Sequence, residues 1–272
     1  MSDIASRPRH LPDFTSPPLN EVVLGVQFSQ PKGYQQIYAG EIWNLFEKEF
    51  PQVQEQSPLP PNFETFGLPM QPRGEFNFIS GAIPNRFWFL RPDGDELIQF
   101  QSDRILHNWK KVGDETNEYP RFEYIIDRFK NELEQVQAYL NKFSPQSLII
   151  NQCEVSYINN IVARKGEEFK YSDWLRFLTF GKKEPDDFSI SFREVMIGKD
   201  GKPNGRLICD SAVGFKADGQ KLVQLNLTVR GAPHETSIKS ALDFITNGRE
   251  LIVNRFAELT TDDAHKKWGR RK

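Results

Sequence analysis

Hydrophobic residues recur with two different periods along the chain, and these periods separate predicted strands from predicted helices. Residues 19–28 alternate between apolar and other side chains, which is typical of a half-buried strand. Residues 121–141 carry apolar side chains mostly at steps of three and four, which predicts an amphipathic helix. A similar stripe over residues 238–256, interrupted by Gly248, predicts a second long helix.

The segments between these elements are shorter, and turn signals such as Pro92-Asp93-Gly94 separate several of them. Proline lacks a backbone N–H, so the six prolines between residues 51 and 73 predict an extended excursion with at most a short edge strand. The remaining predicted elements are helices at residues 37–46, 171–180 and after Thr261, and strands at residues 76–83, 86–90, 97–101, 104–112, 148–162, 188–197, 206–215 and 222–230.

The order of these elements is the same in the two halves of the chain. Each half reads as a strand, a helix, several antiparallel strands and a long helix, and Glu21-Val22 in the first half is echoed by Glu154-Val155 in the second. We therefore expect an α+β fold made by tandem duplication of a β-α-β(n)-α unit. Such a unit builds a curved antiparallel sheet with long helices on one face, as in the TATA-binding protein or in helix-grip folds.

The same pattern divides the chain into an arm and two halves. Residues 1–18 contain four prolines and almost no periodic apolar content, so we expect a flexible arm. Residues 19–145 form the first α+β half, and residues 146–272 form the second, which ends in a basic tail.

Composition and charge narrow the functional classes. The 272 residues carry 35 Lys and Arg against 37 Asp and Glu, so no basic field covers the whole molecule. No long apolar run or secretory signal is present, which predicts a cytoplasmic protein that does not engage a membrane. No feature of the sequence specifies an oligomeric state.

Motifs for catalysis and metal binding are missing from the sequence. It contains no P-loop, no dinucleotide-binding glycine pattern and no nucleophile elbow. The four histidines are far apart and form no helical metal pair, so we expect no metal site and no cofactor. Cys153 and Cys209 lie in apolar runs, which indicates reduced, buried packing residues.

Several segments together resemble a prokaryotic family that is uncharacterised and is distributed sporadically among bacteria and archaea. The similar segments are residues 17–28, 97–110, 119–123, 153–159 and 259–268. The most specific of them contains Asp103-Arg104 and Asn108-Trp109. The resemblance implies a prokaryotic, cytosolic origin and assigns no chemistry. The distribution of the family suggests a role in defence or mobile-element biology.

Two strand regions supply the candidate residues for binding a partner or ligand. The first has polar side chains around a predicted turn, where Arg104 would anchor an anion or carboxylate and Trp109 would form an apolar platform. In the second, Glu154 is predicted to pair with Arg230 or another arginine, an arrangement that is structural more often than catalytic. The full set is Gln101, Asp103, Arg104, Asn108, Trp109, Glu154, Tyr157 and Asn159.

The C-terminal tail offers a different chemistry. Five basic residues surround one tryptophan, and this composition could contact phosphates and stack on a base, although basic termini are also commonly solvated tails. The candidate residues for nucleic-acid binding are Lys266, Lys267, Trp268, Arg270, Arg271 and Lys272.

These observations favour a non-enzymatic binding or regulatory module that engages a partner protein through a sheet face or through a groove between the halves. One alternative is a nucleic-acid-binding protein that uses the sheet and the basic tail. A second alternative is an enzyme that acts on a small ligand held between the halves, with Glu154, Tyr157, Arg104 and Asp103 as the first residues to test.

Overall fold

The fold is α+β and is built on one open, antiparallel sheet of nine strands, in the order β2-β3-β4-β5-β1-β6-β9-β8-β7. The computed structural model describes residues 8–67, 85–143, 148–163, 169–216 and 218–271. The strands are β1 (Leu19–Phe28), β2 (Gln52–Gln56), β3 (Arg86–Leu90), β4 (Glu96–Gln101), β5 (Arg104–Lys110), β6 (Ile150–Val162), β7 (Ser189–Ile197), β8 (Pro203–Phe215) and β9 (Lys221–Gly231).

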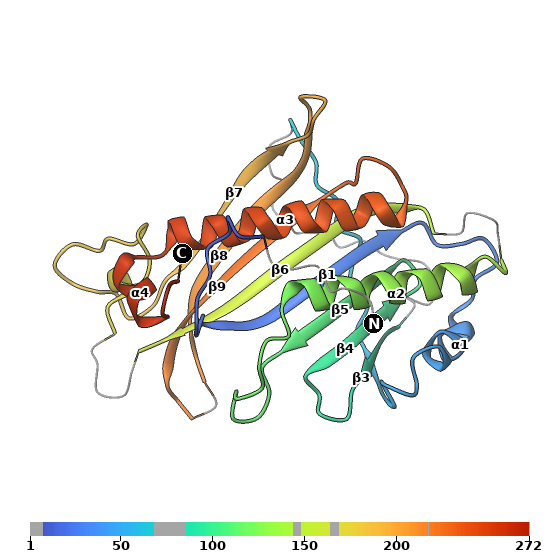
Figure 1. Ribbon diagram of the computed structural model, residues 1–272, viewed down its shortest axis with the longest axis horizontal. Coiled ribbons are helices and arrows are strands. Elements are labelled where there is room, and N and C mark those ends of the chain that lie inside the picture. Colours follow the sequence, from blue (N-terminus) through green and yellow to red (C-terminus); the bar gives the residue numbers. More distant parts are fainter. Residues whose placement is uncertain (1–7, 68–84, 144–147, 164–168, 217, 272) are drawn as a thin grey trace.

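In each part of the chain a short helical segment follows the first strand, and a long helix follows the last strand. The helices are the α-helices α1 (Ala39–Asn44), α2 (Phe122–Leu140), α3 (Ile238–Leu259) and α4 (Asp262–Lys267), with the short 3₁₀ helices η1 (Gln36–Tyr38) and η2 (Tyr171–Asp173). The two long helices lie side by side across the sheet, as Figure 1 shows.

The centre of the sheet is the antiparallel pair formed by β1 and β6. Strand β1 also pairs with β5, and β6 also pairs with β9, so each of the two central strands has two neighbours. Alternate residues of the central pair, such as Val22 opposite Tyr157 and Leu24 opposite Val155, point to the same face of the sheet. This face carries the hydrophobic core.

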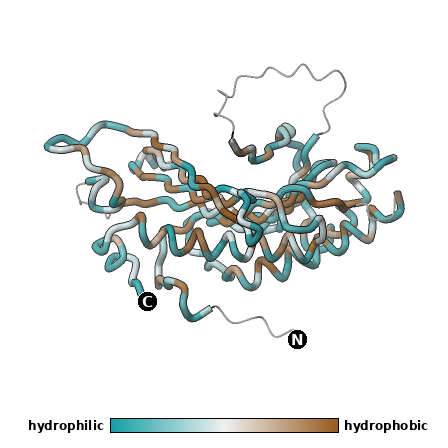
Figure 2. The backbone as a smooth tube through the Cα atoms, turned by 90° about the horizontal axis from the view of Figure 1, so that it is seen from above, coloured by the Kyte–Doolittle hydropathy of each residue, from teal (hydrophilic) through white to brown (hydrophobic). Residues whose placement is uncertain are grey.

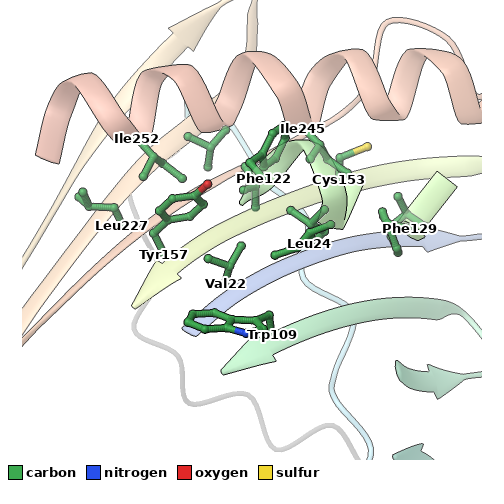
Figure 3. Packing of buried hydrophobic residues seen from close by; sticks show 14 of the residues in the cluster. Val22, Leu24, Trp109, Phe122, Phe129, Cys153, Tyr157, Leu227, Ile245 and Ile252 are labelled. Carbon is green, nitrogen blue, oxygen red and sulfur yellow. The ribbon is translucent and has the colours of Figure 1, made fainter. Parts of the chain in front are cut away.

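Helices α2 and α3 cover that face and bury the core. Ile125, Phe129 and Ile245 on the helices are fully buried, as are Val22 and Leu24 on the sheet. Figure 3 shows Ile245 and Phe129 on the same side of the central strands as Val22 and Leu24. The apolar stripes that predict the two helices are therefore the surfaces that pack on the sheet.

The opposite face of the sheet, called the open face below, carries no helix in the described parts of the chain. Seen from above in Figure 2, the long helices lie on one side of the sheet. The segment of residues 57–66 lies on the other side and contacts the open face. The side chains of Gln27, Arg104 and Glu154 belong to this face, because they alternate with core residues along their strands.

Most predicted elements are present with small changes at their ends. The predicted helix at residues 171–180 is the 3₁₀ helix η2 followed by turns. The described part of the excursion after Pro51, up to residue 67, contains the short strand β2 and no other strand or helix. The strand predicted at residues 76–83 lies outside the described residues.

Residues 8–18, which composition predicts to be a flexible arm, are instead packed against the C-terminal segment. Leu11 and Phe14 are buried, and Phe14 forms an isolated β-bridge with Arg270. The Thr15 N–H donates to the carbonyl of Gly269 at 3.0 Å. The Phe14 ring meets the rings of Phe256, His265 and Trp268, so it anchors this proline-rich stretch against α3 and the C-terminal segment.

The glycine that interrupts the α3 stripe lies where the helix approaches the sheet most closely. A Cβ atom on Gly248 would lie 2.8 Å from the Cγ1 atoms of both Val155 and Val229. Real Cβ atoms do not approach other atoms so closely, so the absence of a side chain allows α3 to rest on β6 and β9.

We therefore expect Gly248→Ala to lower the free energy of unfolding by about 1–3 kcal/mol, the usual cost of overpacking. The loss should outweigh the roughly 1 kcal/mol by which alanine favours a helix over glycine. Urea denaturation measures the effect. Gly40→Ala in α1 is the control, because a Cβ there would meet nothing within 4 Å. A Gly248→Ala protein as stable as wild type would contradict this account of the packing.

Candidate binding surface

A row of polar side chains crosses the open face near one end of the central strands. Gln101 of β4 lies opposite Arg104 of β5, and Arg104 lies opposite Gln27 of β1. The row continues to Gln152 of β6, which lies opposite Gln27 and is buried. Antiparallel register therefore aligns four long polar side chains across four neighbouring strands.

A segment of the chain itself, residues 57–66, lies across this row; we call it the strap. Gln101 binds the backbone of Leu59 twice, accepting from its N–H at 2.9 Å and donating to its carbonyl at 3.1 Å. Gln27 binds Asn62 in the same way, at 3.2 Å and 3.0 Å. Each glutamine amide thus forms two hydrogen bonds with the backbone of one strap residue.

Arginines hold three further carbonyl groups of the strap. Arg104 donates to the carbonyl of Pro60 at 3.1 Å, and Arg206 of β8 donates to that of Thr65 at 2.7 Å. Arg86 of β3 donates to the carbonyl of Ser57 at 3.2 Å. These contacts reach from β3 to β8, so the strap spans most of the sheet.

Several charged groups of the open face are paired with one another. Glu64 of the strap lies 3.0 Å from Arg206 and 3.5 Å from Arg230 of β9. Arg230 also donates to Glu154 at 2.5 Å, which confirms the ion pair predicted from the sequence. Arg104 contacts the Asp103 carboxylate at 3.1 Å. Paired charges of this kind lower the cost of partial burial.

A cavity of about 310 Å³ separates part of the strap from the sheet. Its floor includes Gly25 and Leu106, and its walls include Leu59, Pro60 and Glu154. A side chain at Gly25 would crowd Leu106, since a Cβ would lie 3.1 Å from its Cγ. The cavity lies where β1 and β6 meet, at the centre of the open face.

A second hydrogen-bonded row fixes the side chains farther along the open face. Arg86 and Trp88 both donate to the side-chain oxygen Oε1 of Gln99, at 2.5 and 3.1 Å. Gln99 donates to Asn108 at 2.7 Å, and Asn108 donates to Glu21 at 2.6 Å. Asn108, a candidate residue from the sequence, is thus held inside this network.

The sheet divides the sequence-predicted site residues between its two faces. Gln101, Arg104 and Glu154 lie on the open face with Asp103 at the adjoining turn, and Asn108 lies farther along it. Trp109, Tyr157 and Asn159 point to the helix-covered face, because they alternate with open-face residues along their strands.

The prediction that Trp109 forms a platform beside Arg104 is therefore wrong. Trp109 is 1% exposed and packs against Tyr119 beneath the helices. The Tyr157 hydroxyl lies 3.1 Å from that of Tyr119, and Asn159 donates to the carbonyl of Leu225. The four residues proposed for an enzyme site do not converge, because Tyr157 is on the opposite face from Arg104 and Glu154.

The site residues predicted from the sequence do not include Gln27 and Arg206 of the sheet or Glu64 of the strap, which join the strap to the sheet. Gln27 occupies a polar position of an alternating strand, where a solvated side chain is the ordinary expectation. A sequence signal existed only in the strap, where Pro58, Pro60 and Pro61 leave few backbone donors. The pairing of these donors with glutamines in distant strands depends on the sheet register.

A group of ionisable side chains is buried on the helix-covered face. The His107 Nδ1 atom lies 2.9 Å from Glu132 of α2, and its Nε2 atom lies 3.7 Å from Glu96. Arg128 of α2 lies 3.2 Å from the same Glu96 carboxylate. His107 is fully buried, so this cluster ties α2 to the sheet and does not contact the strap cavity.

The C-terminal residues proposed to bind nucleic acid belong to a packed structure. Trp268 is 7% exposed and stacks with Trp174 and Phe256. Lys267 lies over the Trp174 ring at 4.5 Å, and Lys266 pairs with Asp263 at 2.8 Å. The buried Trp268 ring is used in packing and is not available to stack on a base.

The last arginines are also engaged with neighbouring segments. Arg270 donates to His265 at 2.9 Å, and Arg271 donates to the Thr15 hydroxyl at 3.1 Å. Lys272 lies outside the described residues. The predicted basic tail is therefore a structural link between the N-terminal and C-terminal segments as far as it is described.

The cysteines are buried and reduced, as their apolar neighbours predict. Burial raises the pKa of the Cys153 thiol, and burial is also the main cause that raises the pKa of Cys209 to about 12. Nucleophilic thiols have lowered pKa values, so neither cysteine has the properties of a reactive residue.

Among the described residues, no group of three or more histidine, cysteine or acidic side chains is arranged to hold a metal ion. No described helix combines the length and apolar character needed to cross a membrane. Comparisons with family models, with curated proteins and with solved structures find no match to this chain.

The contacts of His265 make the stability of the protein depend on pH. Its Nδ1 atom accepts from Arg270, and its Nε2 atom lies 2.7 Å from the Thr260 hydroxyl. The Thr260 hydroxyl in turn donates to the carbonyl of Phe256. This arrangement requires a neutral ring. Burial, followed by the charge of Arg270, lowers the pKa of His265 from its usual value of 6.5.

In the unfolded chain His265 takes up a proton near pH 6.5, whereas the folded protein does so only at lower pH. The contribution of the neutral His265 ring to the free energy of unfolding is thus fully present above pH 6.5, and it is lost as the pH falls below that value. We expect wild type to lose more unfolding free energy than His265→Gln between about pH 7.5 and about pH 5.5 in urea titrations. The exposed His234 supplies the control, since His234→Gln should keep the wild-type pH dependence. Parallel pH profiles for wild type and His265→Gln would contradict the prediction.

Proposed function

We propose that this chain is a non-enzymatic binding module that engages a partner protein through the open face of its sheet. One observation supports this proposal above the others. The open face already holds an extended stretch of polypeptide through hydrogen bonds directed at its backbone, with Gln27 and Gln101 as the main contacts. Side chains that bind backbone N–H and carbonyl groups suit a polypeptide ligand.

The two alternatives receive less support from the described residues. For an enzyme, the candidate carboxylates Asp103 and Glu154 are paired with arginines, and Tyr157 is on the other side of the sheet. For a nucleic-acid binder, the only tryptophan of the tail is buried in a cluster of aromatic rings. Both arrangements use the candidate residues for structure.

We also infer that the two halves arose by tandem duplication and form a saddle of the kind found in the TATA-binding protein or in helix-grip folds. In each half the last strand returns to pair with the first, as β5 does with β1 and β9 does with β6. Each half then ends in a long helix, α2 or α3. This arrangement would leave one sheet face for a partner.

The proposal is tested by selecting peptides that bind the open face. Glu64→Ala removes the charged side chain of the strap that contacts Arg206 and Arg230, and it leaves the sheet residues unchanged. A displayed library of random peptides, about twelve residues long, is selected on this variant. We expect enriched peptides whose binding is lost when Gln27→Leu and Gln101→Leu are added, because the backbone contacts are removed.

The matched control is Gln54→Leu in the same Glu64→Ala background. Gln54 is an exposed glutamine of β2, outside the row that holds the strap. Its replacement should leave binding of the enriched peptides unchanged. If no peptide is enriched, or if enriched peptides bind the Gln27→Leu and Gln101→Leu protein equally well, the proposed function is wrong.

A further inference from the structure

This inference rests on the proposed function and specifies its partner. We propose that the open face recognises a proline-rich, extended segment of the partner protein. We propose also that the strap occupies the same part of the open face in the free protein. The strap then competes with the partner, so the free protein is partly self-blocked. The hydrogen bonds of the strap, the distance that it spans and its exposure to solvent each support this assignment.

The backbone donors of the strap match the glutamines of the sheet. Residues 58–62 contain Pro58, Pro60 and Pro61, which have no backbone N–H. Only Leu59 and Asn62 can donate from this stretch, and both donate to glutamine side chains of the sheet. The open face therefore provides a hydrogen-bond acceptor for each backbone N–H that a segment with this pattern of prolines can offer.

The spacing of these donors fits a polyproline II helix. This conformation has three residues per turn, so residues three apart face the same side. Leu59 and Asn62 are three apart, and both turn their backbone groups toward the sheet, where Gln101 and Gln27 receive them. Because a polyproline II helix has no internal hydrogen bonds, its backbone groups are available to such a surface.

The reach of the strap requires an extended chain. From β3 to β8 the sheet order contains six steps between neighbouring strands, a distance of about 29 Å at about 4.8 Å for each step. Eight residue steps separate Ser57 from Thr65 and cover about 25 Å in a polyproline II helix. The arginine side chains of Arg86 and Arg206 bridge the remainder. A more compact segment would not cross the face.

The strap is held in a way that permits exchange. No strap residue is buried as a whole. Phe63 is 52% exposed, and the one side chain that is largely covered, that of Glu64, is the one that makes the ion pairs. Backbone hydrogen bonds, the Glu64 ion pairs and the contact of Arg206 with the Phe66 ring fix it in place. A segment without buried apolar side chains opens at low free-energy cost compared with the core.

The cavity beneath the strap explains how a partner could bind better than the strap does. About 310 Å³ beside Leu59 and Pro60 is not filled by the strap. Leu106 and the bare backbone of Gly25 give this space an apolar floor. A partner segment with a larger apolar side chain at this position would bury additional surface, which favours binding.

The test uses a fluorescent synthetic peptide with the strap sequence, residues 57–66, as the probe. An intramolecular segment competes at an effective concentration in the millimolar range. We therefore expect the peptide to bind Glu64→Ala at least about ten-fold more tightly than wild type. Replacing its three prolines by alanine should weaken binding about ten-fold, because the extended conformation is then no longer pre-organised.

Release of the strap is measured independently by hydrogen exchange. The Leu59 and Asn62 amides donate to glutamines in wild type, so they should exchange faster in Glu64→Ala while the β1 and β6 amides stay protected. Adding Gln27→Leu and Gln101→Leu should abolish peptide binding. Adding Gln54→Leu should not.

The outcomes separate this inference from the proposed function. If library peptides bind the open face but the proline and alanine forms of the probe bind equally, the partner class is wrong and the proposed function stands. Equal binding to wild type and Glu64→Ala, with faster amide exchange in the variant, would overturn the competition. If neither the probe nor the library binds, both proposals fail.

Discussion

The antiparallel pairing of β1 with β6 is the contact on which the rest of the structure depends. Each of these strands begins one half of the sheet; in each half the second strand lies at the outer edge, and the last strand pairs with the first. The core side of the pair, with Val22, Leu24 and Val155, is fully buried beneath α2 and α3. Because both long helices pack on this one side, the described chain leaves the other side without a helix.

A sheet face without helices must satisfy its polar groups by other means. On the open face, Arg104 pairs with Asp103, and Arg230 pairs with Glu154 and Glu64. Glutamines bind the backbone of the strap instead of one another. Since a buried polar group without a partner costs about 1–3 kcal/mol, these contacts make a partly covered polar face compatible with a stable fold. The same contacts give the face its affinity for extended polypeptide in our proposal.

Burial decides which ionisable and aromatic residues are used for packing. His107 lies between Glu96 and Glu132 in the core, and Trp268 completes an aromatic cluster with Trp174. In the sequence, each of the two residues has neighbours typical of a functional site, because His107 lies in a polar strand and Trp268 lies among basic residues. Their positions beneath helices, or among aromatic rings, link elements that are distant in the chain. The polar groups available for binding on the open face are therefore those of the strap and of the row of side chains that holds it.

The sequence by itself determined the elements and the class of the fold. Alternation in residues 19–28 specifies a strand, and the two stripes that include Phe129 and Ile245 specify two helices, because periodicity depends only on local backbone geometry. The same alternation already separates Glu154 from Tyr157, which is three residues further along one strand, and the charge of Glu154 in an apolar run predicts an arginine partner. Tertiary structure alone decided which residues of neighbouring strands contact each of them, and that Gln27 meets Asn62. Such contacts depend on strand order and register, which join residues far apart in the chain, and no local pattern encodes them.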